Sequence, residues 1–144
     1  MRTRQLNHSV YQIRYHIVWG TKYRYKVLKP YVRKELLGFW FELLKTKYPT
    51  LYIHEINTGD DHVHMMIEIP PTIPVCEAIQ KLKAHASIYL KQKFPFIKRI
   101  YEDGAIWSVG YFVSTVGLNE EQIRKYIQKQ NMFDIGTDVS KEFS

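Results

Sequence analysis

Two histidines lie two residues apart in the segment His62-Val63-His64. If this segment is a β-strand, side chains at positions i and i+2 point to the same side, close enough for both imidazoles to ligate one cation. The apolar residues take the alternate positions Val63, Met65, Ile67 and Ile69, which leaves His62, His64, Met66 and Glu68 on the opposite face. Exposed imidazoles that bind no metal have the same short pattern, so the motif alone leaves both interpretations open.

A tyrosine and a glutamine lie one helical turn apart near the end of the chain. The spacing of Asn119 and Gln122 is typical of a helix N-terminus, and the helix that follows is expected to continue to about Gln130. Four of its residues share one face by the 3.6-residue period, namely Ile123, Tyr126, Ile127 and Gln130. A tyrosine ring packed beside two isoleucines explains this pattern equally well, so the residues alone assign no role to Tyr126.

The elements that must position these side chains alternate between two periodicities. Strand-like alternation covers 11–19, 51–58, 62–69 and 106–115. Helical periodicity follows Pro30, up to Pro49, and follows Pro74. The order predicts an α+β, ferredoxin-like βαββαβ fold, in which two helices cover one face of a four-stranded antiparallel sheet and the other face stays open. We expect one domain over 1–144, with a core of about 8–130 and a tail over 131–144.

Positive charge is concentrated at the amino end. The chain carries 21 Lys and Arg against 14 Asp and Glu, and residues 1–30 hold seven of these bases and no acid. In the segment Lys22-Tyr23-Arg24-Tyr25-Lys26, bases alternate with aromatics, a pattern that suits phosphate pairing and base stacking. A basic end that only solubilises the chain is the alternative, but the interleaved tyrosines favour a nucleic acid partner. Further candidates for DNA contacts are Arg14 and His16 on the first strand, and Lys83 and His85 on the second helix. A surface histidine without a DNA contact explains His16 at least as well, and solvent exposure explains His85 better.

Several classes of protein are excluded or disfavoured by composition. The longest uncharged stretch, 104–119, is 16 residues long, shorter than the roughly 20 apolar residues that cross a bilayer, so no membrane role is expected. The single cysteine, Cys76, cannot form an intrachain disulfide or a multi-cysteine zinc cluster. With no apolar secretion signal visible, a reducing cytoplasm is expected. No Walker-type phosphate loop occurs, so no nucleotide cofactor is expected.

Three segments resemble one protein family: IVWGTKYRYKVL, DDHVHMMIEIPP and IWSVGYFVSTVGLNEEQIRKYIQKQ. They are similar to the single-tyrosine HUH transposases of small insertion sequences that move as single-stranded DNA, REP-associated tyrosine transposases included. The resemblance extends from about Tyr11 to Gln130. It implies that His62 and His64 are paired metal ligands, that Gln130 is the third ligand and that Tyr126 is the nucleophile. It also implies a homodimer in which the tyrosine helix of one subunit can complete the site of the other.

The resemblance implies a DNA transposase that cleaves and rejoins single-stranded DNA at hairpin-marked ends through a 5′-phosphotyrosine. Two imidazoles and an amide would ordinarily suit Zn²⁺, whereas the family implies Mg²⁺ or Mn²⁺, which we adopt. Asp60 and Asp61 are candidates to orient the histidines, although turn residues beside Gly59 already have a structural reason. The residues expected to contact DNA are Arg14, Lys22, Tyr23, Arg24 and Lys83.

Two alternatives to an active transposase remain. One is a non-catalytic ferredoxin-like nucleic-acid-binding module, in which Tyr23 and Tyr25 stack on bases. The other is a domesticated relative that still cleaves repeated hairpins but is no longer mobile. Intact motifs do not separate the second alternative from an active element.

Overall fold

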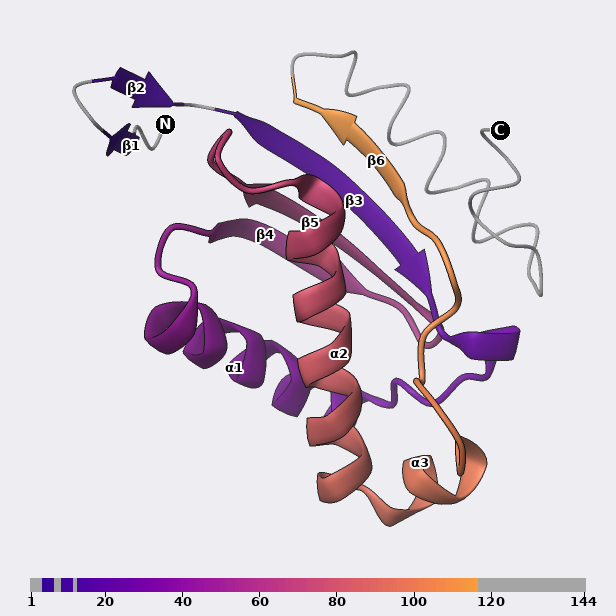
Figure 1. Cartoon of the computed structure of the whole chain (residues 1–144). Helices are drawn as coiled ribbons and strands as arrows, with labels where there is room; N and C mark the ends of the chain where they lie inside the picture. The colour runs from indigo at the N-terminus through magenta and orange to yellow at the C-terminus, as the bar shows by residue number, and fades with distance from the viewer. Residues whose placement is uncertain (1–3, 7–8, 12, 117–144) are drawn as a thin grey trace.

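A four-stranded antiparallel sheet forms the centre of the computed structural model, which describes residues 4–6, 9–11 and 13–116 (Figure 1). The strands follow the spatial order β4-β5-β3-β6. Their bounds are β3 Arg14–Gly20, β4 Tyr52–Thr58, β5 His62–Glu68 and β6 Phe112–Thr115. The two central strands are therefore the first and third of the predicted βαββαβ order, as a ferredoxin-like sheet requires. The predicted fold class is confirmed for this part of the chain.

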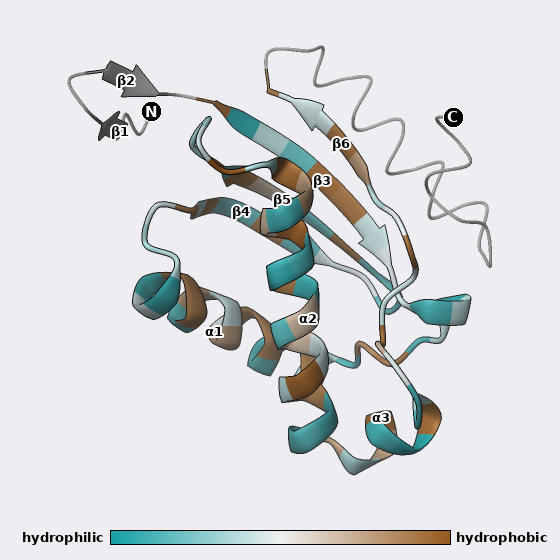
Figure 2. Ribbon diagram, in the orientation of Figure 1, coloured by the Kyte–Doolittle hydropathy of each residue, from teal (hydrophilic) through white to brown (hydrophobic). Residues whose placement is uncertain are grey.

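Two long helices pack on one face of this sheet. Helix α1 spans Pro30–Lys47 and helix α2 spans Val75–Lys93. The hydropathy colouring shows hydrophobic and hydrophilic segments alternating along both helices, as expected of amphipathic helices with one buried side (Figure 2). Between the helices, the Phe39 and Tyr89 rings stack at 4.4 Å, and Trp40 Nε1 donates a 3.0 Å hydrogen bond to the Leu82 carbonyl. These contacts fix the helices to one another above the sheet.

The buried face of the sheet consists of the residues that alternation predicted. Ile17 and Trp19 of β3 and Val63, Met65 and Ile67 of β5 are fully buried. The register pairs Ile17 with Met65 and Trp19 with Val63, so the apolar side chains of adjacent strands lie opposite one another. The histidines of β5 therefore lie on the face away from the helices.

The fourth strand is shorter than expected, because residues 106–111 pack against α2 instead of extending the sheet. Trp107 is buried, its Nε1 donates to the Lys83 carbonyl at 3.0 Å, and its backbone makes only an isolated bridge with Thr21. Gly110 has a φ of 91°, in the left-handed region that interrupts an extended strand. Side-chain anchoring of Trp107 therefore outweighs the strand-like alternation of this segment.

Four short elements were not predicted, and one of them is the 3-10 helix η1 (Lys22–Arg24) directly after β3. The strands β1 (Arg4–Leu6) and β2 (Ser9–Tyr11) form a separate antiparallel pair, so the strand expected from Tyr11 begins at Arg14 instead. Helix α3 (Pro95–Ile100) follows α2 directly. The helix predicted from Asn119 to Gln130 lies outside the described residues. Among the helices that are described, none has the length and apolar content needed to cross a lipid bilayer.

Candidate active site

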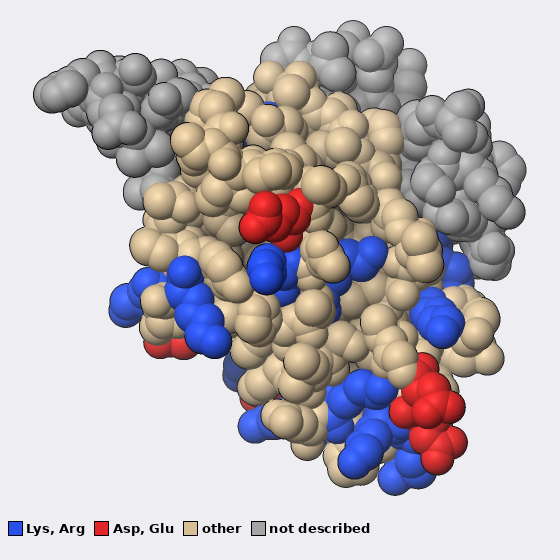
Figure 3. Space-filling model, viewed as in Figure 1, with Lys and Arg blue, Asp and Glu red and all other residues tan. Residues whose placement is uncertain are grey.

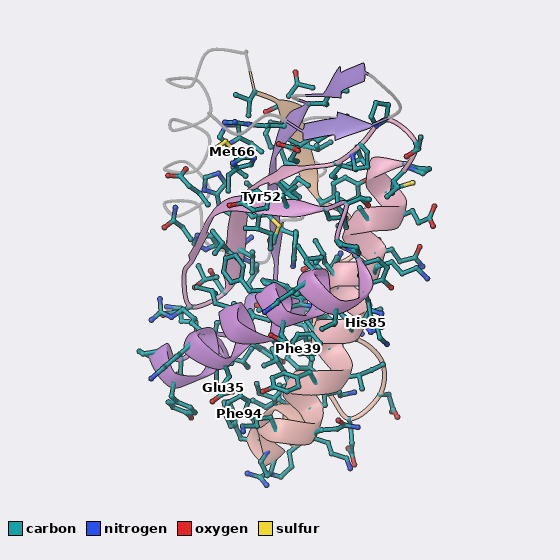
Figure 4. The ribbon with its side chains drawn as sticks, turned by 90° about the vertical axis from the view of Figure 1, so that its left-hand side faces the viewer. Glu35, Phe39, Tyr52, Met66, His85 and Phe94 are labelled. Atoms are coloured by element: carbon teal, nitrogen blue, oxygen red, sulfur yellow. The ribbon has the colours of Figure 1, made fainter. Side chains whose placement is uncertain are left out.

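The histidine pair lies on the sheet face opposite the helices. Strand β5 turns Val63 and Met65 into the core, so His62, His64 and Met66 project from the other side, where each is half-buried. In Figure 4, Met66 points away from the helices, whereas Phe39 and His85 lie among them. The prediction that both imidazoles share the open face is confirmed.

His62 is held by a carboxylate and a glycine. Asp61 is acceptor-only as a carboxylate, so His62 Nδ1 donates to Asp61 Oδ1 at 3.0 Å. This bond places the imidazole proton on Nδ1 and leaves the Nε2 lone pair available as a ligand. A Cβ at Gly59 would lie 2.8 Å from His62 Nδ1, closer than real Cβ contacts allow. The hairpin turn therefore orients the ring as well as reversing the chain.

Asp61 also joins this turn to the segment after β3. Its Oδ2 lies 3.4 Å from Arg24 Nε, and its backbone carbonyl accepts from Thr21 N at 2.9 Å. Burial alone would raise the pKa of Asp61, but the His62 hydrogen bond and the Arg24 guanidinium outweigh it, and the pKa lies below its usual value. Asp61 is thus a carboxylate at neutral pH. Asp60 instead lies 3.7 Å from Arg33, with a more exposed side chain.

His64 contacts a third histidine, which comes from the neighbouring strand. His16 Nδ1 lies 3.3 Å from His64 Nε2, and the two rings stack at 5.6 Å with an interplanar angle of 14°. Burial lowers the pKa of His64 to about 4, and the nearby His16 and His62 shift it in the same direction. His64 is therefore neutral at pH 7. From the sequence, His16 is only a candidate for a DNA contact, whereas the structure brings it into contact with His64.

A second histidine–carboxylate pair joins β4 to β5 at the Glu68 end of β5. His54 Nε2 is 3.1 Å from Glu68 Oε1, and the Glu68 side chain is almost fully buried. A β-bulge between Ile53 and Glu55 gives His54 its position in β4. Sequence reasoning left His54 unassigned, and no signal in the alternation could have found the pair because a bulge shifts the register. Arg14 pairs with Glu68 across the β3–β5 ladder, which places it at this end of the strands.

The basic segment after β3 divides into buried and exposed residues. Tyr23 and Tyr25 are exposed, and Lys22 Nζ lies 5.3 Å from the Tyr23 ring centroid. The Arg24 side chain instead turns inward: it is only 5% exposed and pairs with Asp61, and its expected contact with DNA stays a prediction. Local alternation of bases and aromatics does not reveal this inward turn.

Lys83 lies on the helical side of the molecule and has partners there. Its Nζ donates to the Ser108 carbonyl at 2.8 Å and to the Gly110 carbonyl at 3.3 Å. His85, two residues further along α2, is half-buried, with Nε2 3.2 Å from the Tyr48 hydroxyl. DNA contact by either residue stays a prediction. Lys and Arg side chains also gather over both long helices on the face shown in Figure 3, so positive charge is not confined to the amino end.

The remaining predicted site residues, Tyr126 and Gln130, lie outside the described residues. Within 4–6, 9–11 and 13–116, no three His, Cys, Asp or Glu side chains converge to form a metal site. The described part therefore supplies His62 and His64 on one face, with His16 in contact with His64, and a metal site there would need a further ligand.

The fold and the histidine-bearing strand define a class of protein: a ferredoxin-like domain with paired imidazoles on its open sheet face. Residues 9–130 match the model of the family described as "Transposase IS200 like". This chain therefore belongs to the family of IS200-like transposases, as its resemblance predicted.

Relatives and solved structures agree with this assignment. The transposase for insertion sequence element IS200 of Salmonella typhimurium is 33% identical over 127 residues, covering 88% of this chain and 82% of the relative. The ISDra2 transposase TnpA of Deinococcus radiodurans is 28% identical, covering 85% of this chain and 86% of the relative. The crystal structure of a predicted transposase from Deinococcus radiodurans superposes with a TM-score of 0.74 at 26% identity, covering 88% of this chain and 97% of that one.

A more distant structure shares the fold alone. It is a REP-associated tyrosine transposase bound to a REP hairpin, with a TM-score of 0.54 at 10% identity. The superposition covers 89% of this chain and 72% of that one.

Proposed function

We propose that this transposase cleaves and rejoins single-stranded DNA at hairpin-marked ends through a 5′-phosphotyrosine formed on Tyr126. One observation carries the proposal: His62, fixed by Asp61 at 3.0 Å, lies on the same open face as His64. Surface histidines that bind no metal do not need a carboxylate to fix their tautomer. A histidine that ligates a metal through one ring nitrogen usually donates its other ring N–H to such a carboxylate.

The donor set fits a divalent cation, for which we propose Mg²⁺ or Mn²⁺. His62 and His64 would hold it, with Gln130 as the third protein ligand. These ligands are neutral, so the charge of the cation would act undiminished on a phosphate. When bound, the cation would withdraw electron density from a non-bridging phosphate oxygen and offset the charge that develops in an in-line attack.

The residues of the chain would carry the covalent step. The Tyr126 hydroxyl loses its proton, and its oxygen attacks the phosphorus as the bond to the 3′ oxygen breaks. The departing 3′ oxygen takes up a proton and becomes a free 3′-hydroxyl, while the 5′ phosphate stays on tyrosine. Attack by another 3′-hydroxyl then releases Tyr126 and joins the strands. The energy of the broken phosphodiester bond is retained in the phosphotyrosine bond, so strand transfer needs no nucleotide cofactor.

The proposed partner is single-stranded DNA that folds into hairpins, bound by a homodimer. The amino-terminal excess of seven bases and no acids suits a polyanion. A structural neighbour is bound to a REP hairpin, and hairpin recognition is transferred here as part of the proposal.

The proposal is tested by denaturing electrophoresis after incubation with single-stranded hairpin DNA and Mg²⁺ or Mn²⁺. We expect a covalent protein–DNA adduct with the unaltered chain and none with Tyr126→Phe, while hairpin binding persists because only a hydroxyl is removed. An adduct that persists in Tyr126→Phe would move the nucleophile elsewhere. No adduct in either protein would instead support the non-catalytic binding module.

A further inference from the structure

The segment that follows β3 presents two tyrosines to solvent in an unusual backbone conformation. Tyr23 is 65% exposed and Tyr25 is 48% exposed, with their ring centroids 5.5 Å apart. Tyr23 and Arg24 have φ values of 62° and 55°, in the left-handed region that non-glycine residues rarely adopt. Such strain persists only where the surrounding structure maintains it.

Hydrogen bonds and ring packing hold the strained backbone of Tyr23 and Arg24 in place. Thr21 Oγ1 donates to the Tyr25 carbonyl at 2.8 Å, and the buried Tyr101 donates its hydroxyl to the Lys22 carbonyl at 2.7 Å. The Tyr101 ring also lies beneath Tyr25, with centroids 5.9 Å apart. The segment is thus anchored at Thr21, Lys22 and Arg24, while both tyrosine rings stay outside. The exposed rings of Tyr23 and Tyr25 are therefore carried by a backbone that these hydrogen bonds hold in place.

The chemistry around the rings indicates what they bind. The segment contains three lysines and no acid, namely Lys22, Lys26 and Lys29. The side chains of Lys26 and Lys29 are exposed. Exposed aromatics set among lysines match a strand that offers both π-faces and phosphates. An apolar protein surface would leave these ammonium groups without complementary charge.

The position of the tyrosines relative to the histidine pair gives the segment a place in the reaction. Arg24, which lies between the two tyrosines in sequence, contacts Asp61 Oδ2 at 3.4 Å, and Asp61 Oδ1 accepts from His62 at 3.0 Å. One carboxylate therefore links the tyrosine segment to a proposed metal ligand.

We propose that Tyr23 and Tyr25 form a stacking platform for unpaired bases of the DNA strand, held beside the cleavage site by the Arg24–Asp61 pair. This assignment deepens the proposed function and rests on it for the identity of the strand. The platform contacts bases through ring faces, so it favours single-stranded over duplex DNA without selecting a sequence.

The platform is tested by fluorescence anisotropy with two labelled probes of about ten nucleotides, a length typical of one single-strand site. One probe is oligothymidylate and the other is an abasic oligomer with the same phosphates. We expect the unaltered protein to bind oligothymidylate about tenfold more tightly, the effect of about one stacked base. The double variant Tyr23→Ala, Tyr25→Ala is expected to bind both probes equally.

Two controls separate stacking from folding. Tyr23→Phe with Tyr25→Phe keeps the rings and is expected to retain the preference for oligothymidylate. Tyr31→Ala removes an aromatic side chain of similar exposure, 57%, from a different cluster and is expected to retain it too. Equal binding of both probes by the unaltered protein, or a preference that survives in the double alanine variant, would overturn the platform. Adduct formation by the same unaltered protein would then still support strand cleavage, so the two proposals fail separately.

Discussion

Gly59 provides the surface on which the imidazole of His62 rests. A Cβ at this position would overlap His62 Cε1 and lie 2.8 Å from Nδ1. The glycine backbone also closes the hairpin, because Gly59 N donates to the His62 carbonyl at 2.9 Å. Gly59 therefore both closes the hairpin turn and leaves room for the imidazole of His62, the proposed metal ligand.

Substitution of Gly59 by alanine should displace the His62 ring and weaken Mn²⁺ binding, with little loss of stability because an imidazole can rotate aside. Gly38→Ala is the matched control, since a Cβ there meets no atom within 4 Å. Within α1, this change should raise the free energy of unfolding by about 0.5–1 kcal/mol and leave Mn²⁺ affinity unchanged. Calorimetric titration and thermal unfolding measure both effects. Equal Mn²⁺ affinity in the two variants would contradict the role of Gly59.

Removal of the Asp61 charge should weaken metal binding without touching a ligand. Asp61→Asn no longer holds the His62 proton on Nδ1 by a carboxylate, so we expect Mn²⁺ affinity to fall about 10- to 100-fold. Asp60→Asn is the control, because Asp60 pairs with Arg33 at 3.7 Å and not with a histidine. Its Mn²⁺ affinity should equal that of the unaltered chain. If both asparagine variants bind alike in calorimetry, Asp61 has no positioning role.

The salt dependence of DNA binding should distinguish two lysines. Each phosphate contact contributes a slope of about 0.7–0.9 to the plot of log affinity against log salt, and Lys22→Ala should reduce the slope by that amount. Lys83→Ala should leave the slope unchanged, because its ammonium binds the Ser108 and Gly110 carbonyls. It should instead lower the free energy of unfolding by about 1–3 kcal/mol. A reduced slope for Lys83→Ala would instead support the DNA contact that the sequence predicts for this residue.

The proposed dimer predicts complementation between two inactive proteins. One carries His62→Ala and His64→Ala, and the other carries Tyr126→Phe. If the tyrosine helix of one subunit completes the site of its partner, the mixture should regain cleavage, because one of its two sites combines both intact halves. Subunit exchange must first be shown by labelling. A mixture that exchanges subunits and stays inactive would indicate a site assembled within each subunit.

Local sequence determined the fold and the faces of its strands. The alternation of Val63, Met65 and Ile67 with His62 and His64 was sufficient, because a side-chain period of two and one apolar set leave only one way to orient the strand. The order of elements was likewise sufficient for the sheet, since few topologies connect these strands with short loops. Both predictions were made without knowledge of any tertiary contact, and the structure confirms them.

Tertiary structure alone decided the partners of these side chains. His16 meets His64 across a ladder, His54 reaches Glu68 through a bulge, and Arg24 turns inward to Asp61. These contacts depend on register, on an inserted residue and on left-handed backbone angles, which carry no periodic signal in sequence. They form because a sheet fixes which residues of distant segments become neighbours, and burial then favours the polar pairs that satisfy one another.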